Sequence, residues 1–157
     1  MELKTKIKAE PGEQQLLITR NFDLPVALLF KAFDSAELLG NWMGTQVTIL
    51  ENKPLGKYHF ETKDPSGNVV FEASGTIHSI EQDKLIVRTF EMANAPFGAQ
   101  LEFLNFKALG DSDNQSVLEM QVIYRSKEIR DQMLKLPFAS GISKAHDRLE
   151  ALMREGA

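Results

Sequence analysis

The C-terminal region constrains the fold more than any other part of the chain. Within residues 137–153, apolar side chains recur at steps of three and four residues, at Phe138, Ile142, Ala145, Leu149 and Leu152/Met153. This spacing places them on one face of a helix, with Ser143, Lys144, Asp147 and Arg148 elsewhere. One amphipathic helix at the end of a strand-rich chain has to bury its apolar stripe against a sheet.

The residues before this helix predict a strand, two short helices and then about six strands. The expected strands are 15–22, 46–52, 55–63, 69–80, 85–91, 101–108 and 117–124. Pro25 opens the first short helix, and a capping box of Asp34 and Glu37 opens the second, which ends at Gly44. The order predicts an α+β fold with one antiparallel sheet.

Alternation along the strands predicts one buried and one wet sheet face. In the last strand Leu118, Met120, Val122 and Tyr124 share a face, opposite Glu119. On the same reasoning we expect Glu72, Glu102 and Glu119 to lie on solvated faces, opposite the apolar positions.

The helical pattern changes phase at Pro137. Ser126 can cap a segment that carries Ile129, Met133 and Leu136, whose stripe lies roughly opposite the later one. Because the residue before a proline resists helical geometry, we expect two helical pieces or one sharp kink. Residues 126–136 would then form a rim or lid.

Length and composition indicate one domain. The 157 residues divide into a polar lead-in, 1–14, and a single domain, 15–157. A net charge of −4 without a Lys/Arg cluster gives no reason to expect nucleic acid or an anionic membrane as partner. No apolar run approaches the roughly 18 residues that span a bilayer, and the start lacks a signal peptide's apolar core. We therefore expect a cytoplasmic protein without membrane insertion.

The sequence contains no recognisable catalytic or metal-binding motif. It has no cysteine, no nucleophile elbow and no phosphate-binding loop. The three histidines, His59, His78 and His146, are far apart and have no metal-ligand spacing, so His59 and His78 are expected at a surface or strand edge. We predict no catalytic residue, no cofactor and no metal.

Several stretches together resemble a known family. Residues 18–44 read ITRNFDLPVALLFKAFDSAELLGNWMG, and GKYHF, DPSG and GISKAHDRLEAL follow at residues 56–60, 64–67 and 141–152. Over roughly residues 15–154 the chain resembles the activator of heat shock protein 90 ATPase homologue-like family. The chain departs from the family's usual residues at Met43, Ile142 and His146, where tryptophan, tryptophan and leucine are common.

The resemblance implies the helix-grip fold of the START-like, or SRPBCC, superfamily. In this fold a curved antiparallel sheet, here of about six or seven strands, wraps a long C-terminal helix and encloses a hydrophobic cavity. The cavity candidates are Trp42, Met43, Tyr58, Phe60, Phe71, Phe103, Met120, Tyr124, Phe138, Ile142 and His146. For His146 a partly exposed position at the rim is favoured over one pointing into the cavity.

Three functions follow from the resemblance. The first is binding of a small apolar or amphipathic molecule in the cavity, by a monomer or weak homodimer. The second is a co-chaperone-like role in the stress response, with a chaperone as partner. We expect it to be the weaker alternative, because the eukaryotic co-chaperone carries an additional N-terminal domain ahead of the similar domain. The third is a cyclase or dehydratase, for which His146 or Tyr124 would supply the acid or base.

Overall fold

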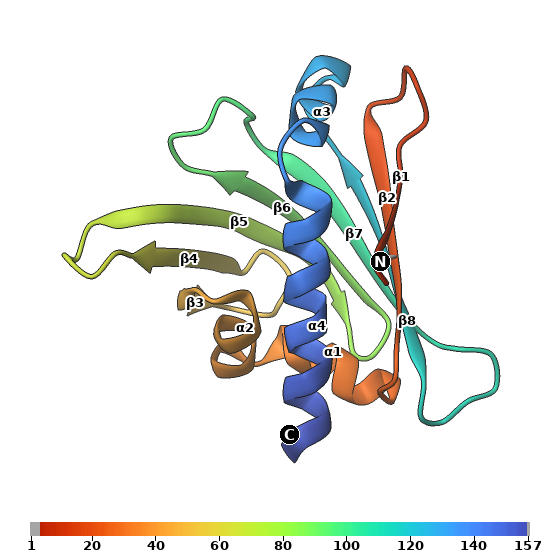
Figure 1. The fold of residues 1–157 in the computed structure, drawn as a ribbon. Coiled ribbons are helices and arrows are strands. Elements are labelled where there is room, and N and C mark those ends of the chain that lie inside the picture. The colour runs from red at the N-terminus through yellow and green to blue at the C-terminus, as the bar shows by residue number, and fades with distance from the viewer. Residues whose placement is uncertain (1–3, 157) are drawn as a thin grey trace.

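The computed structural model describes residues 4–156 as a curved antiparallel sheet that wraps a long C-terminal helix (Figure 1). Residues 1–3 of the expected lead-in, and residue 157, lie outside the described residues. The strands are β1 (Lys6–Lys8), β2 (Gln15–Phe22), β3 (Gln46–Leu50), β4 (Lys57–Lys63), β5 (Val69–Glu81), β6 (Leu85–Met92), β7 (Gln100–Ala108) and β8 (Ser116–Ile123). The helices are α1 (Val26–Asp34), α2 (Ala36–Met43), α3 (Lys127–Leu134) and α4 (Phe138–Gly156).

All eight strands form one sheet in the order β1-β2-β8-β7-β6-β5-β4-β3. Each neighbouring pair is antiparallel, and the early strand β2 pairs with the last strand β8 along its whole length. Helices α1 and α2 connect β2 to β3 and close one end of the concave face, which α4 crosses (Figure 1). The predicted α+β helix-grip arrangement is confirmed.

The strand that the sequence does not predict is β1. Residues 6–8 lie in the expected polar lead-in, yet Ile7 pairs with Ile18 of β2 and extends the sheet by one edge strand. Three residues with the letters KIK carry too little alternation to be distinguished from a polar loop. Residues 6–8 therefore form a strand through main-chain pairing with β2, which their side-chain pattern does not predict.

The cap of α2 differs from the prediction by one residue. Ser35, rather than Asp34, is the N-cap, and its hydroxyl accepts a hydrogen bond from the Leu38 amide at 3.3 Å. The Asp34 carboxylate instead accepts a hydrogen bond from the Asn52 side chain at 2.7 Å. Gly44 ends the helix in the left-handed conformation, with φ of 71°, as predicted.

Part of the core lies between the concave face and helices α1 and α2. Leu29 of α1 and Leu104 of β7 are completely buried there. Phe30 and Phe33 both make edge contacts with Phe106 of β7, at ring-centre distances of 5.1 and 5.4 Å. Such aromatic contacts fix how the helices sit on the sheet.

Two separate helices form the C-terminal region, as the phase change at Pro137 predicts. The Ser126 hydroxyl accepts a hydrogen bond from the Ile129 amide at 3.1 Å and so caps α3. Arg130, 3% exposed, donates hydrogen bonds to the backbone carbonyls of Glu10 and Gln15 at 2.7 and 3.3 Å. These bonds fasten α3 to the chain segment just before β2.

A buried cation holds α4 against the sheet. Arg20 points inward from β2 and is 1% exposed. Its guanidinium donates to the carboxylates of Asp147 and Glu150 at 2.5 and 3.3 Å, and Glu150 also accepts from the Asp23 amide at 2.6 Å. The sheet therefore grips α4 through charge as well as through apolar contact.

The buried face of α4 is rotated from the expected stripe. Ser143, which lies outside the expected apolar stripe, is 2% exposed, as is His146, whereas Ala145 is only half-buried. The rotation follows from the surface that α4 meets, because Arg20 and Thr5 present polar groups to the helix. The apolar pattern alone could not reveal these polar partners.

Candidate ligand-binding site

Burial decreases along α4 from its C-terminal half to its start. Leu149 and Met153 are 0% and 2% exposed. Phe138 and Ile142 are only half-buried, and residues 139–141 between them are exposed. The closest packing partners of α4 are helices α1 and α2. The helix is therefore anchored by its C-terminal half, while its first turns cover the concave face less completely.

The concave face shows a matching gradient. Phe71 of β5 and the β6 residues Phe90 and Met92 border the core but stay half-buried. Ala73, which pairs with Met92, and Phe60, which pairs with Ala73, are at most 1% exposed. Apolar side chains thus continue outward from the packed core along β4 to β6, and helix α4 does not fully cover them.

An ion pair lies on the concave face where β8 leads toward α3 and the start of α4. Nε of Arg88 on β6 donates to Oε1 of Glu102 on β7 at 2.9 Å. The Gln100 side chain donates to the other carboxylate oxygen at 2.8 Å. Glu102 is 5% exposed. A carboxylate this far from water is held by these hydrogen bonds.

The inward position of Glu102 contradicts the prediction that it faces solvent. In the observed register Glu102 pairs with Val122, and it shares its face with the buried residues Leu104 and Phe106. The sequence LEFLNFK carries apolar residues at both odd and even positions, so alternation does not decide which set faces inward. Glu72 and Glu119 are only partly buried, in line with their expected solvated faces.

Tyr58 on β4 lies next to the Arg88–Glu102 ion pair on the concave face. Its ring lies over Gly75 of β5, where a β-carbon would approach the ring to 2.6 Å, and its hydroxyl donates to the Thr89 carbonyl. The Arg88 guanidinium sits 5.1 Å from the ring centre, a cation–π distance. Glycine at position 75 is therefore what allows the tyrosine to lie flat beside the ion pair.

Tyr124 follows the end of β8 and is 2% exposed. Burial raises the pKa of its phenol well above the ordinary value, and the negative charge of Glu102 raises it further. Burial likewise raises the pKa of Tyr58. Both phenols stay protonated at neutral pH, so the two tyrosines present neutral hydroxyl groups rather than phenolates.

The predicted cavity residues separate into three groups. Tyr58, Phe60, Met120 and Tyr124 are buried on the concave side. Met43, Phe71, Phe138 and Ile142 are half-buried next to the core. Phe103 lies on the opposite, convex face, because it pairs with Gln121 and alternates with the inward residues Glu102 and Leu104. Phe103 is therefore removed from the candidate site.

Trp42 belongs to the packed helical layer. It is 5% exposed, and its indole N–H donates to the Ala32 carbonyl at 2.9 Å. Its ring meets Phe33 edge-on at a centre distance of 5.1 Å. A tryptophan with its N–H satisfied inside the core contributes to packing and offers no free polar group to a ligand.

His146 is part of the core, so the prediction of a partly exposed rim position is wrong. It is 2% exposed, lies 5.6 Å from Phe22 and 6.4 Å from Trp42 between ring centres, and its Nδ1 is 2.9 Å from the Thr5 hydroxyl. Burial lowers its pKa to about 4, and the nearby Arg20 charge acts in the same direction. The imidazole is neutral at pH 7 and enclosed on all sides by protein.

Sequence reasoning missed the residues that give the concave face its polarity. Arg88, Gln100 and Glu102 occupy strand positions whose facing depends on register, and no motif marks them. The available signal was indirect: Arg88 and Glu102 carry opposite charges and lie on strands that follow one another in the chain.

The comparisons with known proteins agree with this architecture. The model of the family described as Activator of Hsp90 ATPase homolog 1-like protein matches residues 23–154. The chain belongs to this family. A comparison with curated proteins found no match. Family and fold together support a ligand-binding or co-chaperone-like domain in general terms, without naming a ligand.

Solved structures share the fold of this family member at low sequence identity. A protein from Arthrobacter aurescens is 16% identical, with a TM-score of 0.83 over 97% of this chain and 92% of that one. A protein from Rhodobacter sphaeroides is 21% identical, with a TM-score of 0.81 over 95% and 99% of the two chains. One from Mycobacterium smegmatis is 18% identical, with a TM-score of 0.79 over 98% of each.

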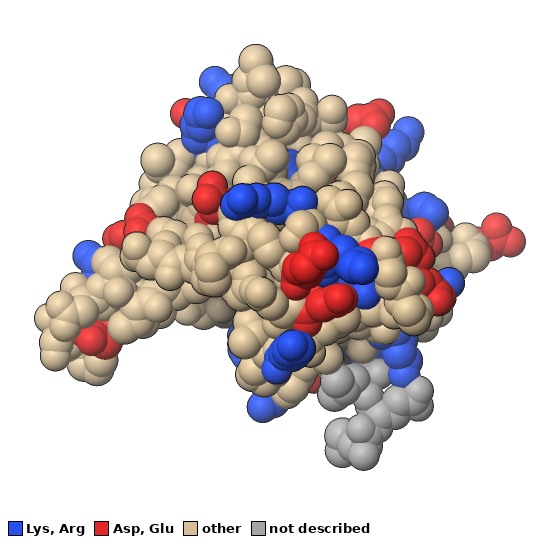
Figure 2. All heavy atoms as spheres, turned by 90° about the horizontal axis from the view of Figure 1, so that it is seen from above, with Lys and Arg blue, Asp and Glu red and all other residues tan. Residues whose placement is uncertain are grey.

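Charge and hydropathy add two observations. Figure 2 shows Lys and Arg interspersed with Asp and Glu on the face seen from above, without a large patch of one sign. No helix among the described residues is long and apolar enough to cross a membrane.

Proposed function

We propose that the protein binds a small amphipathic molecule between the concave face and the first turns of α4. The observation that carries the proposal is the Arg88–Glu102 ion pair, which lies on the same sheet face as a row of half-buried apolar side chains. The apolar body of the ligand would contact Phe71, Phe90 and Met92 of that row. A polar group of the ligand would reach the ion pair.

The hydrogen-bond donors of Arg88 support this position for the polar group of the ligand. Its Nε is bonded to Glu102, but its Nη1 and Nη2 groups donate to no acceptor within residues 4–156. The side chain is 11% exposed, so these donors are not sealed in the core. Since Glu102 already neutralises Arg88, a neutral acceptor such as a ketone or hydroxyl oxygen fits better than a carboxylate.

Magnitudes show why a polar anchor matters. A ligand that buries about 300 Å² of apolar surface gains about 7 kcal/mol, and association costs at least about 4 kcal/mol. The remainder corresponds to weak binding. A hydrogen bond to a charged group contributes about 1.5–3 kcal/mol, enough to raise affinity by one to two orders of magnitude.

The test compares oxygenated and hydrocarbon ligands in displacing anilinonaphthalene sulfonate from the protein. We expect a long-chain methyl ketone to bind more tightly than the alkane of equal length. Arg88→Met/Glu102→Met removes both charges without leaving one unpaired, and should abolish this preference while retaining apolar binding. The matched control, Lys107→Met/Glu119→Met, removes an exposed 3.3 Å ion pair of the sheet and should keep the preference. An unchanged preference in the first variant would contradict the proposal.

A co-chaperone-like role is the second candidate, favoured by the family to which the chain belongs. It predicts that adding the protein raises the ATPase rate of a heat shock protein 90 chaperone. An unchanged rate at saturating protein would reject it. The enzyme alternative loses its leading acid–base residue, because His146 contacts Thr5, Phe22 and Trp42 rather than open space.

A further inference from the structure

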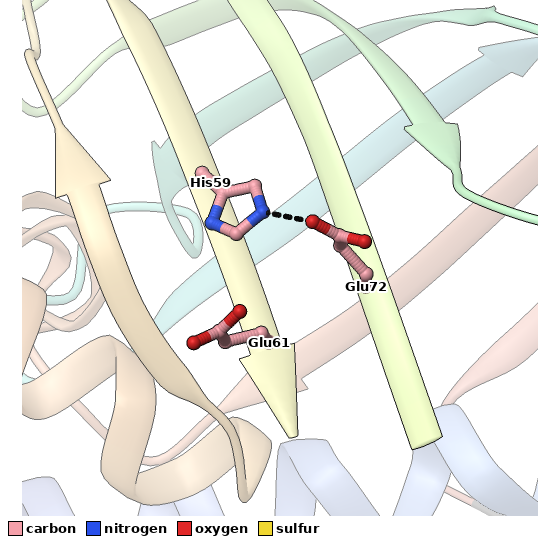
Figure 3. A group of neighbouring side chains, drawn as sticks. All are labelled: His59, Glu61 and Glu72. Atoms are coloured by element: carbon pink, nitrogen blue, oxygen red, sulfur yellow. Dashed lines mark hydrogen bonds and ion pairs between the residues drawn. The ribbon is translucent and has the colours of Figure 1, made fainter. Parts of the chain in front are cut away.

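Three potential metal ligands converge on the convex face, away from the proposed ligand site. His59 and Glu61 are two residues apart on β4, and Glu72 is the β5 partner of Glu61 (Figure 3). One ligand atom from each lies within 4.8 Å of the others. Residues two apart on a strand share a face, and the register adds the third ligand from the neighbouring strand.

The hydrogen bonds of His59 prepare its Nε2 for a cation. Nε2 is 2.6 Å from Oε2 of Glu72, so two atoms that both bind metals already face each other. On the other side of the ring, Nδ1 is 2.5 Å from the Thr48 hydroxyl. That hydroxyl can give its own proton to the His59 carbonyl at 3.3 Å, which leaves its oxygen free to accept from Nδ1–H. Such an outer partner fixes the tautomer in which Nε2 presents its lone pair to a metal.

We propose that His59 Nε2 and one oxygen each from Glu61 and Glu72 bind a divalent transition-metal ion, with Zn²⁺ as the best match. One imidazole nitrogen and two carboxylate oxygens suit zinc, whereas Mg²⁺ and Ca²⁺ prefer oxygen ligands alone. The metal takes the place of the hydrogen bond between His59 Nε2 and Glu72 Oε2. Lys63, whose Nζ lies 3.8 Å from Glu61, is 51% exposed and can turn into solvent as the ion enters.

Three protein ligands leave a further coordination position for water or another molecule. The three side chains are 23%, 20% and 39% exposed for His59, Glu61 and Glu72, so solvent reaches the cluster. His59 also lines a surface hollow of about 410 Å³, together with Lys57, Ser74 and Glu91. The hollow gives a small metal-bound molecule a place beside the ion.

The proposal is tested by calorimetric titration of the intact protein with Zn²⁺ and, separately, Mg²⁺. We expect one Zn²⁺ per chain and no comparable Mg²⁺ binding. His59→Gln and Glu72→Gln should each weaken Zn²⁺ binding by more than about a hundredfold, beyond the 10–100-fold typical of outer partners. His78→Gln, at an exposed histidine of β5, is the matched control and should bind as the wild type does.

Thr48 is a positioning residue, and its variants separate a positioning role from a merely structural one. Thr48→Val should weaken Zn²⁺ binding by about tenfold, while Thr48→Ser, which keeps the hydroxyl, should restore it. Unfolding in urea confirms that each variant is folded. The proposal is overturned if the wild type does not bind Zn²⁺, or if His59→Gln binds it as tightly as the wild type and His78→Gln do.

Discussion

Stability should fall steeply below neutral pH because His146 is buried in its neutral form. The pKa of His146 is lowered from 6.5 to about 4 by burial, with a further contribution from Arg20. Between these two values the unfolded chain binds a proton that the native chain rejects, so acid favours unfolding. The contribution of neutral His146 to the free energy of unfolding is therefore complete above pH 6.5 and is lost as the pH falls toward 4.

The size of the effect follows from the two pKa values. At pH 5.0 the unfolded chain is protonated at His146 and the native chain is almost fully neutral there. Protonation of His146 in the unfolded chain then lowers the free energy of unfolding by about 2 kcal/mol, whereas at pH 7.5 it lowers it by almost nothing. With a urea dependence of about 2 kcal/mol per molar, the unfolding midpoint should drop by about 1 M.

The assay is urea unfolding at pH 7.5 and 5.0 for the wild type and for His146→Leu. Leucine cannot titrate, so the variant should lose about 2 kcal/mol less than the wild type between the two pH values. His78→Leu removes an exposed histidine and should behave like the wild type. If His146→Leu and the wild type lose equal stability between pH 7.5 and 5.0, the assignment of a buried neutral imidazole is wrong.

Further predictions concern the grip on α4 and two glycines. Arg20→Ala removes the buried partner of Asp147 and Glu150 and should lower the free energy of unfolding by about 2–3 kcal/mol, less than for a fully buried pair because the Asp147 side chain is 57% exposed. A loss under about 1 kcal/mol in urea unfolding would contradict this role of Arg20. Gly75→Ala should cost more than about 2 kcal/mol, because its β-carbon would lie 2.0 Å from the Thr89 carbonyl oxygen and 2.6 Å from Tyr58. Gly141→Ala, in α4, adds a carbon with no atom within 4 Å apart from its chain neighbours and the helix's own backbone, and should instead stabilise the protein by about 0.5–1 kcal/mol. Equal effects of the two glycine substitutions on the thermal midpoint would refute this reading of the packing.

The sequence was sufficient for the elements whose signals are local. The spacing of apolar residues in 138–153 predicts α4, and Ser126 and Pro137 predict its separation from α3, since periodicity, capping and proline geometry depend only on neighbouring residues. Gly44 ends α2 for the same kind of reason. The family resemblance then supplies the wrapping of the sheet around the helix.

The candidate sites could not be predicted because they depend on contacts between distant residues. The imidazole of His146 is buried against Thr5, 141 positions earlier in the chain. Glu102 faces inward only because of the register of β7 with β8, in a strand whose two faces are both partly apolar. His59 meets Glu72 only once β4 and β5 are aligned. None of these pairings leaves a pattern in the sequence itself.

The most direct test of the proposed function is an NMR titration of the labelled protein with the long-chain methyl ketone. We expect the largest amide shifts at Arg88 and Glu102 on the sheet and at Ile142 on α4, with little change at Trp42 in the packed helical layer. The alkane of equal length should leave the Arg88 and Glu102 signals largely unshifted. Shifts confined to the outer face of the sheet, or no saturable shifts at all, would contradict a ligand site on the concave face.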